Sequence, residues 1–455
     1  MALTGRAALL ALLGTLVVLF APDPALAVAG TALLLLALIA VDLLLAGSVR
    51  PLRLSRAGDR LVRLGETATV ELIVENPGPR RVRGVLRDAW PPSAGAAPRH
   101  LALDVPAGER RRLVTTLTPT RRGDREAVTV TVRALGPLGI AARQGSHRVP
   151  WSVRVLPPFL SRKHLPAKLS RLRELEGRHP SMIRGQGTEF DSLREYVVGD
   201  DVRSIDWRAT ARRNDVVVRT WRPERDRRVL IVLDTGRTSA GRVGTAPIPL
   251  AGEVPRTRGA HDRTTVAPGW PRLDWSMDAA LLLAALATRA GDRVDFLAHD
   301  RAVRAWVSGA SRTDLLSTLV NTMAPIEAEL IEADSADMVA AVLARAKRRC
   351  LVVVLTDLNA ASLEEGLLPV LPQLSSRHLV LLAAVSDPQV AAMSTGRGTS
   401  ELVYGAAAAE RQDAERRRIT ARLRRHGVEV VDAAPEQIAP ALADAYLALK
   451  AAGRL

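Results

Sequence analysis

Cysteine is almost absent from this chain of 455 residues, which contains Cys350 and no other. A disulfide framework and a cysteine-rich metal site are therefore both excluded. Cys350 opens the apolar run 350–355, so we expect its side chain to act as a small buried hydrophobe. A single buried thiol is compatible with a reducing compartment and does not establish one.

Lysine is also scarce, and it occurs only at Lys163, Lys168, Lys347 and Lys450. Arginine therefore carries most of the positive charge behind the formal net charge of +16. Acidic and basic residues alternate through most of the chain instead of forming one basic block. We therefore expect no nucleic-acid partner, and a basic surface that faces solvent and an anionic membrane.

The chain also lacks the sequence motifs of common enzyme classes. Gly185 and Gly187 have neither a preceding apolar strand nor a third glycine, so they do not form a dinucleotide-binding loop. No Gly-x-x-x-x-Gly-Lys-Ser/Thr nucleotide cradle and no Gly-x-Ser-x-Gly elbow occurs, and the eight histidines lack metal-ligand spacing. We predict that the protein is not an enzyme.

Two long apolar runs, at 7–20 and 25–46, open the sequence. The second can cross the ~30 Å hydrocarbon core of a membrane, whereas the first spans only if it recruits Ala2 and Leu3 or if the bilayer thins. We predict a transmembrane hairpin over 1–49. Asp42 lies near the end of the second run, where we expect it at the membrane interface.

A cleaved secretory signal is the alternative, because Arg6, the first apolar run and the tripeptide 25–27 fit its three-part layout. Both alternatives give the same orientation. Arg50, Arg53 and Arg56 follow the second run, and the turn between the runs has no positive charge. The positive-inside bias then predicts a multi-pass protein of the cytoplasmic membrane whose soluble domains are cytoplasmic.

The soluble part is predicted to be α/β overall. Residues 50–156 alternate short β-branched runs with turn clusters, which is typical of a small antiparallel β-sandwich. Residues 157–227 form a charged connector with a helix at 168–176. Over 228–455, buried strands alternate with helices, which predicts a doubly wound domain on a parallel sheet, with a Gly- and Pro-rich loop inserted at 241–271.

The insertion follows the first strand, beyond the carboxyl end where such folds bind ligands. We predict strands at 228–234, 293–297, 351–356 and 379–385, and helices at 277–289, 313–323, 336–345 and 363–371.

Polar residues follow two of these strands. The first ends in Asp234, with Thr238 four residues later, and another ends in Thr356 and Asp357. Carboxylates and hydroxyls at the carboxyl ends of neighbouring strands supply the hard oxygen ligands that Mg²⁺ prefers. The pattern resembles the metal-ion-dependent adhesion site of von Willebrand factor A domains, in which Asp-x-Ser-x-Ser is joined by a Thr and an Asp from later loops.

On that resemblance, Asp234 and Asp357 match the acidic positions and Thr238 matches the second hydroxyl. Ser335 is a loose match for the middle threonine. Gly236 stands where the first serine should be, so one hydroxyl ligand is lost. A working Mg²⁺ site and a vestigial one therefore both remain open.

A denser polar pattern precedes the first strand. Its members are Gly187, Glu189, Phe190, Arg194, Tyr196, Gly199, Asp200, Asp201, Arg203, Asp206, Trp207 and Arg212. The pattern closely resembles the hallmark of the MoxR-associated, von Willebrand factor A-like bacterial proteins known as domain of unknown function 58. The resemblance is strongest over 184–240 and extends, through the architecture, to nearly the whole chain.

Two interpretations of this hallmark remain open. Asp200 or Asp201 is predicted to cap a helix that carries Ile205 and Ala209 on one face. The polar residues then form either a docking surface or a buried salt-bridge network that braces the sheet, with Trp207 as packing.

The resemblance implies a membrane-anchored binding or assembly protein that works with a MoxR-type AAA+ ATPase. Arg237 is predicted to engage a carboxylate of the partner bidentately. A metal-dependent hydrolase using Asp234 and Asp357 is the alternative. No His or Glu lies near either carboxylate in the sequence to serve as a general base, which favours the binding protein.

Overall fold

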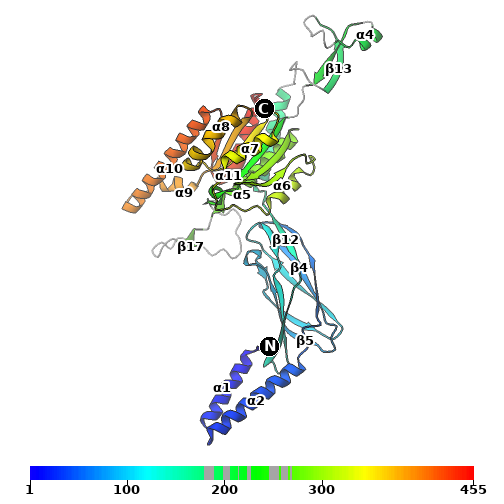
Figure 1. Ribbon diagram of the computed structural model, residues 1–455, viewed down its shortest axis with the longest axis vertical. Coiled ribbons are helices and arrows are strands. Elements are labelled where there is room, and N and C mark those ends of the chain that lie inside the picture. The colour runs from blue at the N-terminus through cyan, green and yellow to red at the C-terminus, as the bar shows by residue number, and fades with distance from the viewer. Residues whose placement is uncertain are drawn as a thin grey trace. The chain divides into compact units, whose positions relative to one another are not determined.

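The structure, a computed structural model, describes residues 1–178, 189–197, 205–213, 215–222, 227–244, 256–257, 265–266 and 269–455. The chain divides into two compact units (Figure 1). The first consists of Met1–Pro158 and Ala246–Val266, and the second of Phe159–Thr245 and Ala267–Leu455. Sheets and helices both contribute, which confirms the predicted mixed α/β class.

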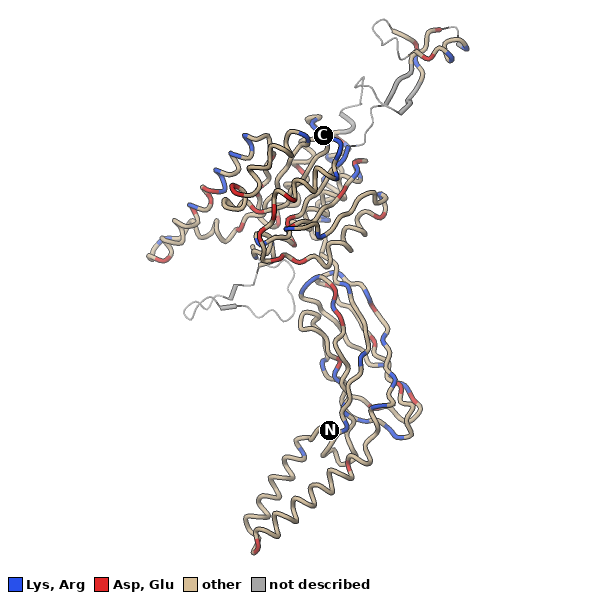
Figure 2. The backbone as a smooth tube through the Cα atoms, in the orientation of Figure 1, with Lys and Arg blue, Asp and Glu red and all other residues tan. Residues whose placement is uncertain are grey.

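Two apolar helices open the first unit, α1 (Gly5–Leu19) and α2 (Pro24–Leu45). Asp23 caps α2 by accepting hydrogen bonds from the backbone N–H groups of Ala25 and Leu26. Figure 2 shows that both helices are nearly free of charged residues. Within the described ranges, α2 is the one helix that is long and apolar enough to cross a membrane, with a mean hydropathy of 2.5.

The structure therefore contains one candidate transmembrane helix where two were predicted. Helix α1 has 15 residues and rises about 22 Å, which is less than the ~30 Å of a hydrocarbon core. Ala2 and Leu3 do not lengthen it, because they form strand β1 (Ala2–Leu3), whose Leu3 pairs with Ala141.

Asp42, which was predicted to lie at the membrane interface, is fully buried against the β-rich part of the same unit. Its carboxylate accepts backbone hydrogen bonds from Leu138 (2.8 Å), Ile140 (2.7 Å) and Ala141 (2.8 Å). Three donors offset the cost of burying a carboxylate, so the residue joins α2 to a turn almost one hundred positions later in the chain.

The strands within 53–156, together with β1, form three sheets, in the orders β1-β11-β10-β5-β7, β2-β4-β8-β6 and β3-β12-β9. All pairings are antiparallel except that of β12 with β3. The strands are β2 (Arg53–Gly58), β3 (Leu61–Arg63), β4 (Ala68–Glu75), β5 (Val82–Ala89), β6 (Ala96–Ala97), β7 (His100–Val105), β8 (Arg110–Leu117), β9 (Gly123–Glu126), β10 (Thr129–Leu135), β11 (Ala141–His147) and β12 (Ser152–Leu156), with the short helix η1 (Pro92–Ala94).

The period-two alternation of these strands produces their common core. In β4, Ala68, Val70, Leu72 and Val74 are buried, while the residues between them are more exposed. Leu72 and Val74 belong to one hydrophobic cluster with residues of β5, β7 and β10, which come from the other large sheet. Two antiparallel sheets therefore share one core, as in a β-sandwich.

The second unit contains a six-stranded sheet in the order β21-β20-β15-β22-β23-β24. Neighbouring strands are parallel, except that β21 is antiparallel to β20. The strands are β15 (Arg228–Asp234), β20 (Arg293–His299), β21 (Val303–Val307), β22 (Leu351–Leu355), β23 (Leu379–Val385) and β24 (Glu429–Ala433).

Helices cover both faces of this sheet (Figure 1). On one face, α5 (Arg272–Arg289) packs against β15 and β20, and α11 (Pro435–Ala451) packs against α5 and β23. On the other face, Leu230 and Val232 share a core with residues of α7, α8 and α10. These helices are α7 (Ser335–Arg345), η5 (Ser362–Leu367), α8 (Leu368–Ser375) and α10 (Ser400–Arg425). Further helices of this unit include η2 (Leu160–His164), α3 (Leu165–Arg178), α6 (Leu315–Met323) and α9 (Pro388–Met393).

The loop predicted at 241–271 contains paired strands where it is described. Strand β16 (Arg242–Val243) pairs with β19 (Trp270–Pro271), and β17 (Arg256–Thr257) pairs with β18 (Thr265–Val266). The first pair begins and closes the insertion, directly ahead of α5.

Candidate functional site

The order of strands in the second unit defines where a site is expected. Strand β15 lies between β20 and β22, and the chain proceeds outwards from it in both directions. Ligands of such sheets bind beyond the carboxyl ends of the strands at this switch point. Asp234 is the last residue of β15, and Thr356 and Asp357 follow β22.

Asp234 is buried at this edge and accepts three hydrogen bonds. Its donors are the backbone N–H of Gly236 (2.8 Å), the hydroxyl of Thr238 (3.1 Å) and the hydroxyl of Thr356 (2.6 Å). Burial raises the pKa of Asp234, and the three donors oppose that rise without cancelling it. Thr238 lies in η4 (Arg237–Ala240), the short turn that follows β15.

Gly236 is enclosed by a neighbouring loop. A Cβ atom at this position would lie 3.1 Å from the carbonyl oxygen of Ile331 and 3.2 Å from the Cβ of Ala333. The same carbonyl oxygen accepts a hydrogen bond from the backbone N–H of Arg237 at 2.7 Å. The loop therefore occupies the space into which a serine side chain at position 236 would project.

Asp357 does not bond to Asp234 or Thr238 but lies in a buried charge cluster. Arg416 Nη1 donates to Asp357 Oδ1 at 2.8 Å, and Arg272 Nη1 lies 3.4 Å from Asp357 Oδ2. Arg416 also donates to both oxygens of Asp432, at 2.7 and 3.2 Å. We call Asp357, Arg416, Asp432 and Arg272 the carboxyl-edge charge cluster.

Arg416 is the centre of this cluster and is only 8% exposed. Burial by itself lowers the pKa of an arginine, but the hydrogen bonds and charges of Asp432 and Asp357 outweigh it and raise the pKa of Arg416. The guanidinium is therefore charged, and Arg416 and Arg272 together balance the two carboxylates of Asp357 and Asp432.

The arrangement does not fit a Mg²⁺ ion. Position 236 offers no hydroxyl, Asp234 is satisfied by three donors, and Asp357 is held by two arginines. Ser335 begins α7, and no hydrogen bond joins its hydroxyl to Asp234, Thr238 or Asp357 in the part of the chain that is described. Among those residues, no three His, Cys, Asp or Glu side chains gather as a metal-binding group.

His299, which the sequence patterns did not single out, lies on the adjacent strand β20 and pairs in register with Asp234. His299 Nε2 lies 2.8 Å from Asp337 Oδ2 on α7, and the buried His299 Nδ1 has no hydrogen-bond partner among the described residues. The loop after β20 adds Asp300, which accepts a hydrogen bond from the Thr235 hydroxyl at 3.0 Å. The isolated histidine in the sequence gave no sign of this placement.

Arg237, the predicted partner-binding residue, is paired with Glu332, with 2.6 Å between Arg237 Nη2 and Glu332 Oε1. Both side chains are more than half exposed, and an exposed pair of this kind contributes little to stability. The guanidinium therefore remains accessible to another carboxylate.

The hallmark forms a small element of its own where it is described. Strand β13 (Glu189–Glu195) pairs with β14 (Val217–Arg222), and α4 (Trp207–Arg213) lies between them in the sequence. Glu189, Phe190 and Arg194 belong to β13, Tyr196 follows it, and Arg212 is an exposed residue of α4. Gly187, Gly199, Asp200, Asp201 and Arg203 lie outside the described residues.

The cap of the hallmark helix differs from the prediction. Asp206 Oδ1 accepts hydrogen bonds from the backbone N–H groups of Arg208 and Ala209, both at 3.0 Å, so α4 begins at Trp207. Ile205 is not helical but pairs with Val218. Trp207 is 69% exposed, so its predicted packing role is wrong.

The carboxyl edge also carries a pocket and an apolar surface. The pocket has a volume of about 650 Å³ and lies between the ends of β23 and β24 and the helices α9 and α10, with Arg416 and Asp432 in its wall. Large apolar side chains on the same two helices are exposed, namely Met393, Leu402, Val403 and Tyr404. We call these four residues the α9–α10 apolar patch.

Fold and site together define an α/β protein with a cluster of carboxylates, hydroxyls and arginines at the carboxyl edge of its sheet. The chain belongs to the family DUF58, described as a protein of unknown function, whose profile matches residues 192–247 and 271–429. The interval between the two matches falls within the insertion after β15. A comparison with curated proteins finds no match.

Among solved structures, the chain is similar to the CARDB domain of a Pyrococcus furiosus protein, determined in complex with di-metal ions. The sequences are 18% identical, and the match covers 23% of this chain and 91% of that one, with a TM-score of 0.18. A likeness this weak carries no argument about fold or function.

Proposed function

We propose that the protein is a membrane-anchored binding module with a von Willebrand factor A-like domain, and that it works with a MoxR-type AAA+ ATPase. The α9–α10 apolar patch is the observation that carries this proposal. Tyr404 is 77% exposed, and Leu402 and Val403 are each 50% exposed. Exposed apolar groups on two neighbouring helices are typical of a protein-interaction surface.

The strand order supports the von Willebrand-like assignment. Counted along the chain, the sheet has the order 3-2-1-4-5-6, and the aspartate and hydroxyl residues of the adhesion site lie at its switch point. The metal ligands of that site are in large part replaced here by internal hydrogen bonds and by Arg416. Partner binding would then depend on side chains such as Arg237 and on the apolar patch rather than on Mg²⁺.

A hairpin of α1 and α2 is favoured over a cleaved signal. Strand β1, before α1, and Asp42, at the end of α2, both contact the segment 136–142. Both ends of the hairpin therefore lie on one side of any membrane that it enters. Cleavage near residue 27 would remove β1 together with the two hydrogen bonds of the Thr4 hydroxyl.

A cytoplasmic location of the soluble units is part of the proposal. Arg50, Arg53 and Arg56 follow α2, and the positive-inside bias acts on them before the β-rich unit folds and pairs Arg56 with Asp88. Protease added to sealed, right-side-out cells should leave everything after Arg50 intact, and digestion of the β-rich unit there would contradict the orientation.

The hydrolase alternative has weaker support, because both candidate carboxylates already have hydrogen-bond donors. The partner is tested by affinity capture of the tagged, detergent-solubilised chain, with mass spectrometry of the captured proteins. We expect an AAA+ ATPase with wild type, and a loss of at least fivefold with the triple variant Leu402→Ser/Val403→Ser/Tyr404→Ser.

The matched control is Val303→Ser, which changes an exposed apolar residue on the opposite edge strand β21 and should leave capture unchanged. Arg237→Ala should weaken capture without unfolding the chain. Equal capture by wild type and the triple variant would move the docking surface away from α9 and α10. Absence of any AAA+ ATPase from the wild-type capture would refute the proposed partner.

A further inference from the structure

Arginines from distant parts of the sequence meet where α2 ends in the first unit. Arg143 Nε donates a hydrogen bond to the carbonyl oxygen of Leu43 at 2.9 Å. Arg80 Nη1 donates to the carbonyl oxygen of the next residue, Leu44. Consecutive residues of an α-helix lie about 100° apart around its axis, so these two guanidinium groups approach α2 from different sides.

Arg6 brings a third guanidinium group to the same end of α2. Its Nη1 donates to the carbonyl oxygen of Leu138 at 3.1 Å. The backbone N–H of Leu138 in turn donates to the carboxylate of Asp42, which lies in the last turn of α2. We call Arg6, Arg80 and Arg143 the hairpin collar, because they surround the place where the apolar helices leave the β-rich part of the unit.

The collar carries a net positive charge. None of its three arginines forms an ion pair within the described part of the chain. Asp42 lies beside them, but its carboxylate is buried and already accepts from three backbone N–H groups. Asp104 does not reduce the charge, because it is paired with Arg81 at 2.5 Å. Three cations therefore face one buried carboxylate.

The side chains around the collar are apolar and exposed. Leu44, which accepts from Arg80, is 65% exposed, and the neighbouring Leu45 is 53% exposed. Leu138, which accepts from Arg6, is 41% exposed. Cations beside exposed apolar groups are typical of a surface at the level of lipid head groups, where apolar contact and attraction to anionic lipids act together.

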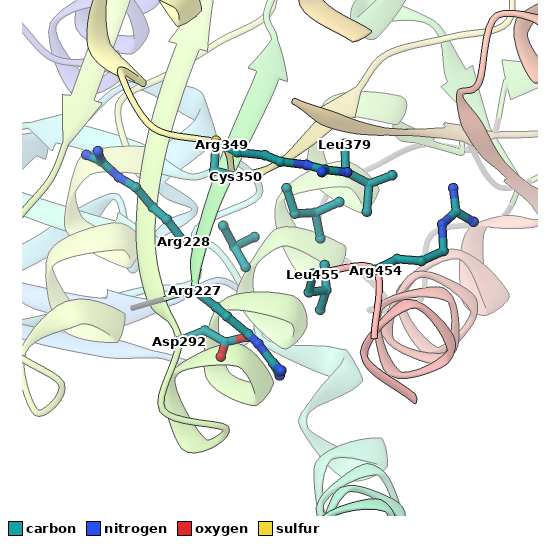
Figure 3. Close-up of a pocket in the computed structure, with 10 residues that line it drawn as sticks. Arg227, Arg228, Asp292, Arg349, Cys350, Leu379, Arg454 and Leu455 are labelled. Carbon is teal, nitrogen blue, oxygen red and sulfur yellow. The ribbon is translucent and has the colours of Figure 1, made fainter. Parts of the chain in front are cut away.

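Arginines also gather in the second unit, around a pocket of about 250 Å³ at the amino-terminal edge of the six-stranded sheet. Figure 3 shows that the side chains of Arg227 and Arg349 extend in different directions there. Arg228 and Arg454 are paired with acidic residues, and the same wall contains Leu455. The described guanidinium groups of this pocket are therefore separated or paired, whereas those of the collar all lie at the end of one helix.

We propose that the hairpin collar binds the phosphate groups of anionic phospholipids, with separate lipid molecules on different sides of α2. The inference rests on the membrane anchoring proposed above and adds the class of lipid that the anchor prefers. Each guanidinium donates one hydrogen bond to a carbonyl group and keeps further N–H groups for phosphate oxygens. Cations placed around a helix match a layer of head groups, whereas a single soluble anion would contact one arginine at a time.

The test measures which lipids the protein retains. The full chain is incorporated into nanodiscs of equimolar phosphatidylglycerol and phosphatidylcholine and extracted with a neutral detergent, and native mass spectrometry counts the bound lipids. An arginine near an anionic surface strengthens binding roughly fivefold, so wild type should retain phosphatidylglycerol over phosphatidylcholine by roughly fivefold or more. The triple variant Arg6→Gln/Arg80→Gln/Arg143→Gln should retain the two lipids equally.

Arg87→Gln is the matched control and should leave the lipid preference unchanged. Arg87 is exposed and forms no ion pair among the described residues. It lies on β5, five positions and roughly 17 Å beyond Val82, and Val82 is the residue of that strand beside Gly47, just after α2.

A charge-preserving variant separates electrostatics from packing. Arg6→Lys/Arg80→Lys/Arg143→Lys keeps three cations at the end of α2 and should restore most of the preference for phosphatidylglycerol. If this variant loses the preference as completely as the glutamine variant, the effect comes from altered packing and the proposal is overturned. Equal retention of phosphatidylglycerol by wild type and the glutamine variant would overturn it as well.

Two further arms identify the source of the phosphate and test the anchor. At fixed ionic strength, millimolar inorganic phosphate or glycerol phosphate should not displace the retained phosphatidylglycerol, and displacement by either would assign the collar to a soluble anion instead. Wild type and the glutamine variant should both float with vesicles of phosphatidylcholine alone, because the apolar surfaces of α1 and α2 are unchanged. Failure of wild type to float would refute membrane anchoring itself, and the collar with it.

Discussion

Arg416 connects two carboxylates that sequence patterns treat as unrelated. Asp357 follows β22 and Asp432 lies in β24, and the guanidinium between them is almost completely buried. A buried ion pair often adds little net stability, but removing one partner leaves an uncompensated charge in a low-dielectric environment. Substitution of Arg416 by a neutral residue therefore leaves two carboxylates and one arginine in the carboxyl-edge charge cluster.

We predict that Arg416→Gln lowers the free energy of unfolding by about 3–5 kcal/mol, because Asp357 and Asp432 lose their shared cation. Denaturant titration of the detergent-solubilised chain measures the change. Arg411→Gln is the control, since Arg411 lies on the same helix in an exposed pair with Glu415 and should change stability by less than about 1 kcal/mol. Similar effects of the two substitutions would mean that the buried cluster has no special role.

The thermal stability gained from Mg²⁺ should differ between wild type and Arg416→Gln. Wild type is expected to gain little thermal stability from millimolar Mg²⁺, because Arg416 already neutralises Asp357. Arg416→Gln leaves Asp357 with Arg272 and leaves Asp432 without its cation, so the melting temperature of the variant should rise more with Mg²⁺ than that of wild type. A large Mg²⁺ shift in wild type that Asp234→Ala abolishes would show that the adhesion-type site works despite Gly236.

Gly236→Ser restores the missing serine of the adhesion motif, yet we predict that it destabilises the chain by about 1–3 kcal/mol. The added Cβ would meet the carbonyl oxygen of Ile331 at 3.1 Å, so the loop must shift. Gly405→Ala in helix α10 is the control, because its Cβ would meet only Met393 Cε at 3.5 Å. A neutral or stabilising Gly236→Ser in thermal unfolding would show that the loop yields easily.

At the scale of elements, Asp278 makes the contact between α5 and η2 sensitive to pH. Burial raises its pKa from the usual 3.8 to about 6, although the backbone N–H of Ser161 donates to the carboxylate at 3.1 Å. Between these values the folded chain keeps a proton that the unfolded chain releases, so the contribution of Asp278 to stability falls as pH rises from about 4 to 6.

Asp278→Asn should therefore stabilise the chain at pH 7.5 by on the order of 2–3 kcal/mol, since the amide oxygen still accepts from Ser161 and carries no charge. At pH 4, where the aspartate is largely protonated, the two proteins should be nearly equal. Unfolding curves at the two pH values measure this difference. A gain of equal size at both would rule out titration of Asp278 as its cause.

Elements with a strong apolar periodicity could be predicted from the sequence. Elements and residues whose role depends on contacts with distant parts of the chain could not. Strand 228–234 is a continuous apolar run and matches β15, and the helices predicted at 313–323 and 336–345 match α6 and α7 to within two residues. Helix α10 is rich in Arg and Ala with few large apolar residues, so nothing marked it or Arg416 within it. Thr356, beside the predicted Asp357, is the residue that reaches Asp234, because successive side chains in an extended segment point in opposite directions.

At the scale of the whole molecule, Asp42 determines how α2 is attached to the β-rich unit. We predict that Asp42→Ala speeds proteolytic cleavage within 136–141, because three backbone N–H groups lose their acceptor. Leu36→Ala, on an exposed position of the same helix, should leave the cleavage rate unchanged. Timed proteolysis in detergent gives both rates, and equal rates would mean that the turn keeps its structure without Asp42.

The pairing of β1 with β11 also sets an order of events during biosynthesis. Ala2 and Leu3 are translated about 140 residues ahead of their partners Ala142 and Ala141. At ~5–20 residues per second, the amino terminus waits roughly 7–30 seconds before its strand can form. During that interval α1 and α2 are already available to the insertion machinery, whereas the sheet that receives β1 does not yet exist. In the membrane-anchored protein that we propose, insertion would therefore precede completion of the β-rich unit, and closing that sheet would fix both ends of the α1–α2 hairpin on the side where translation continues.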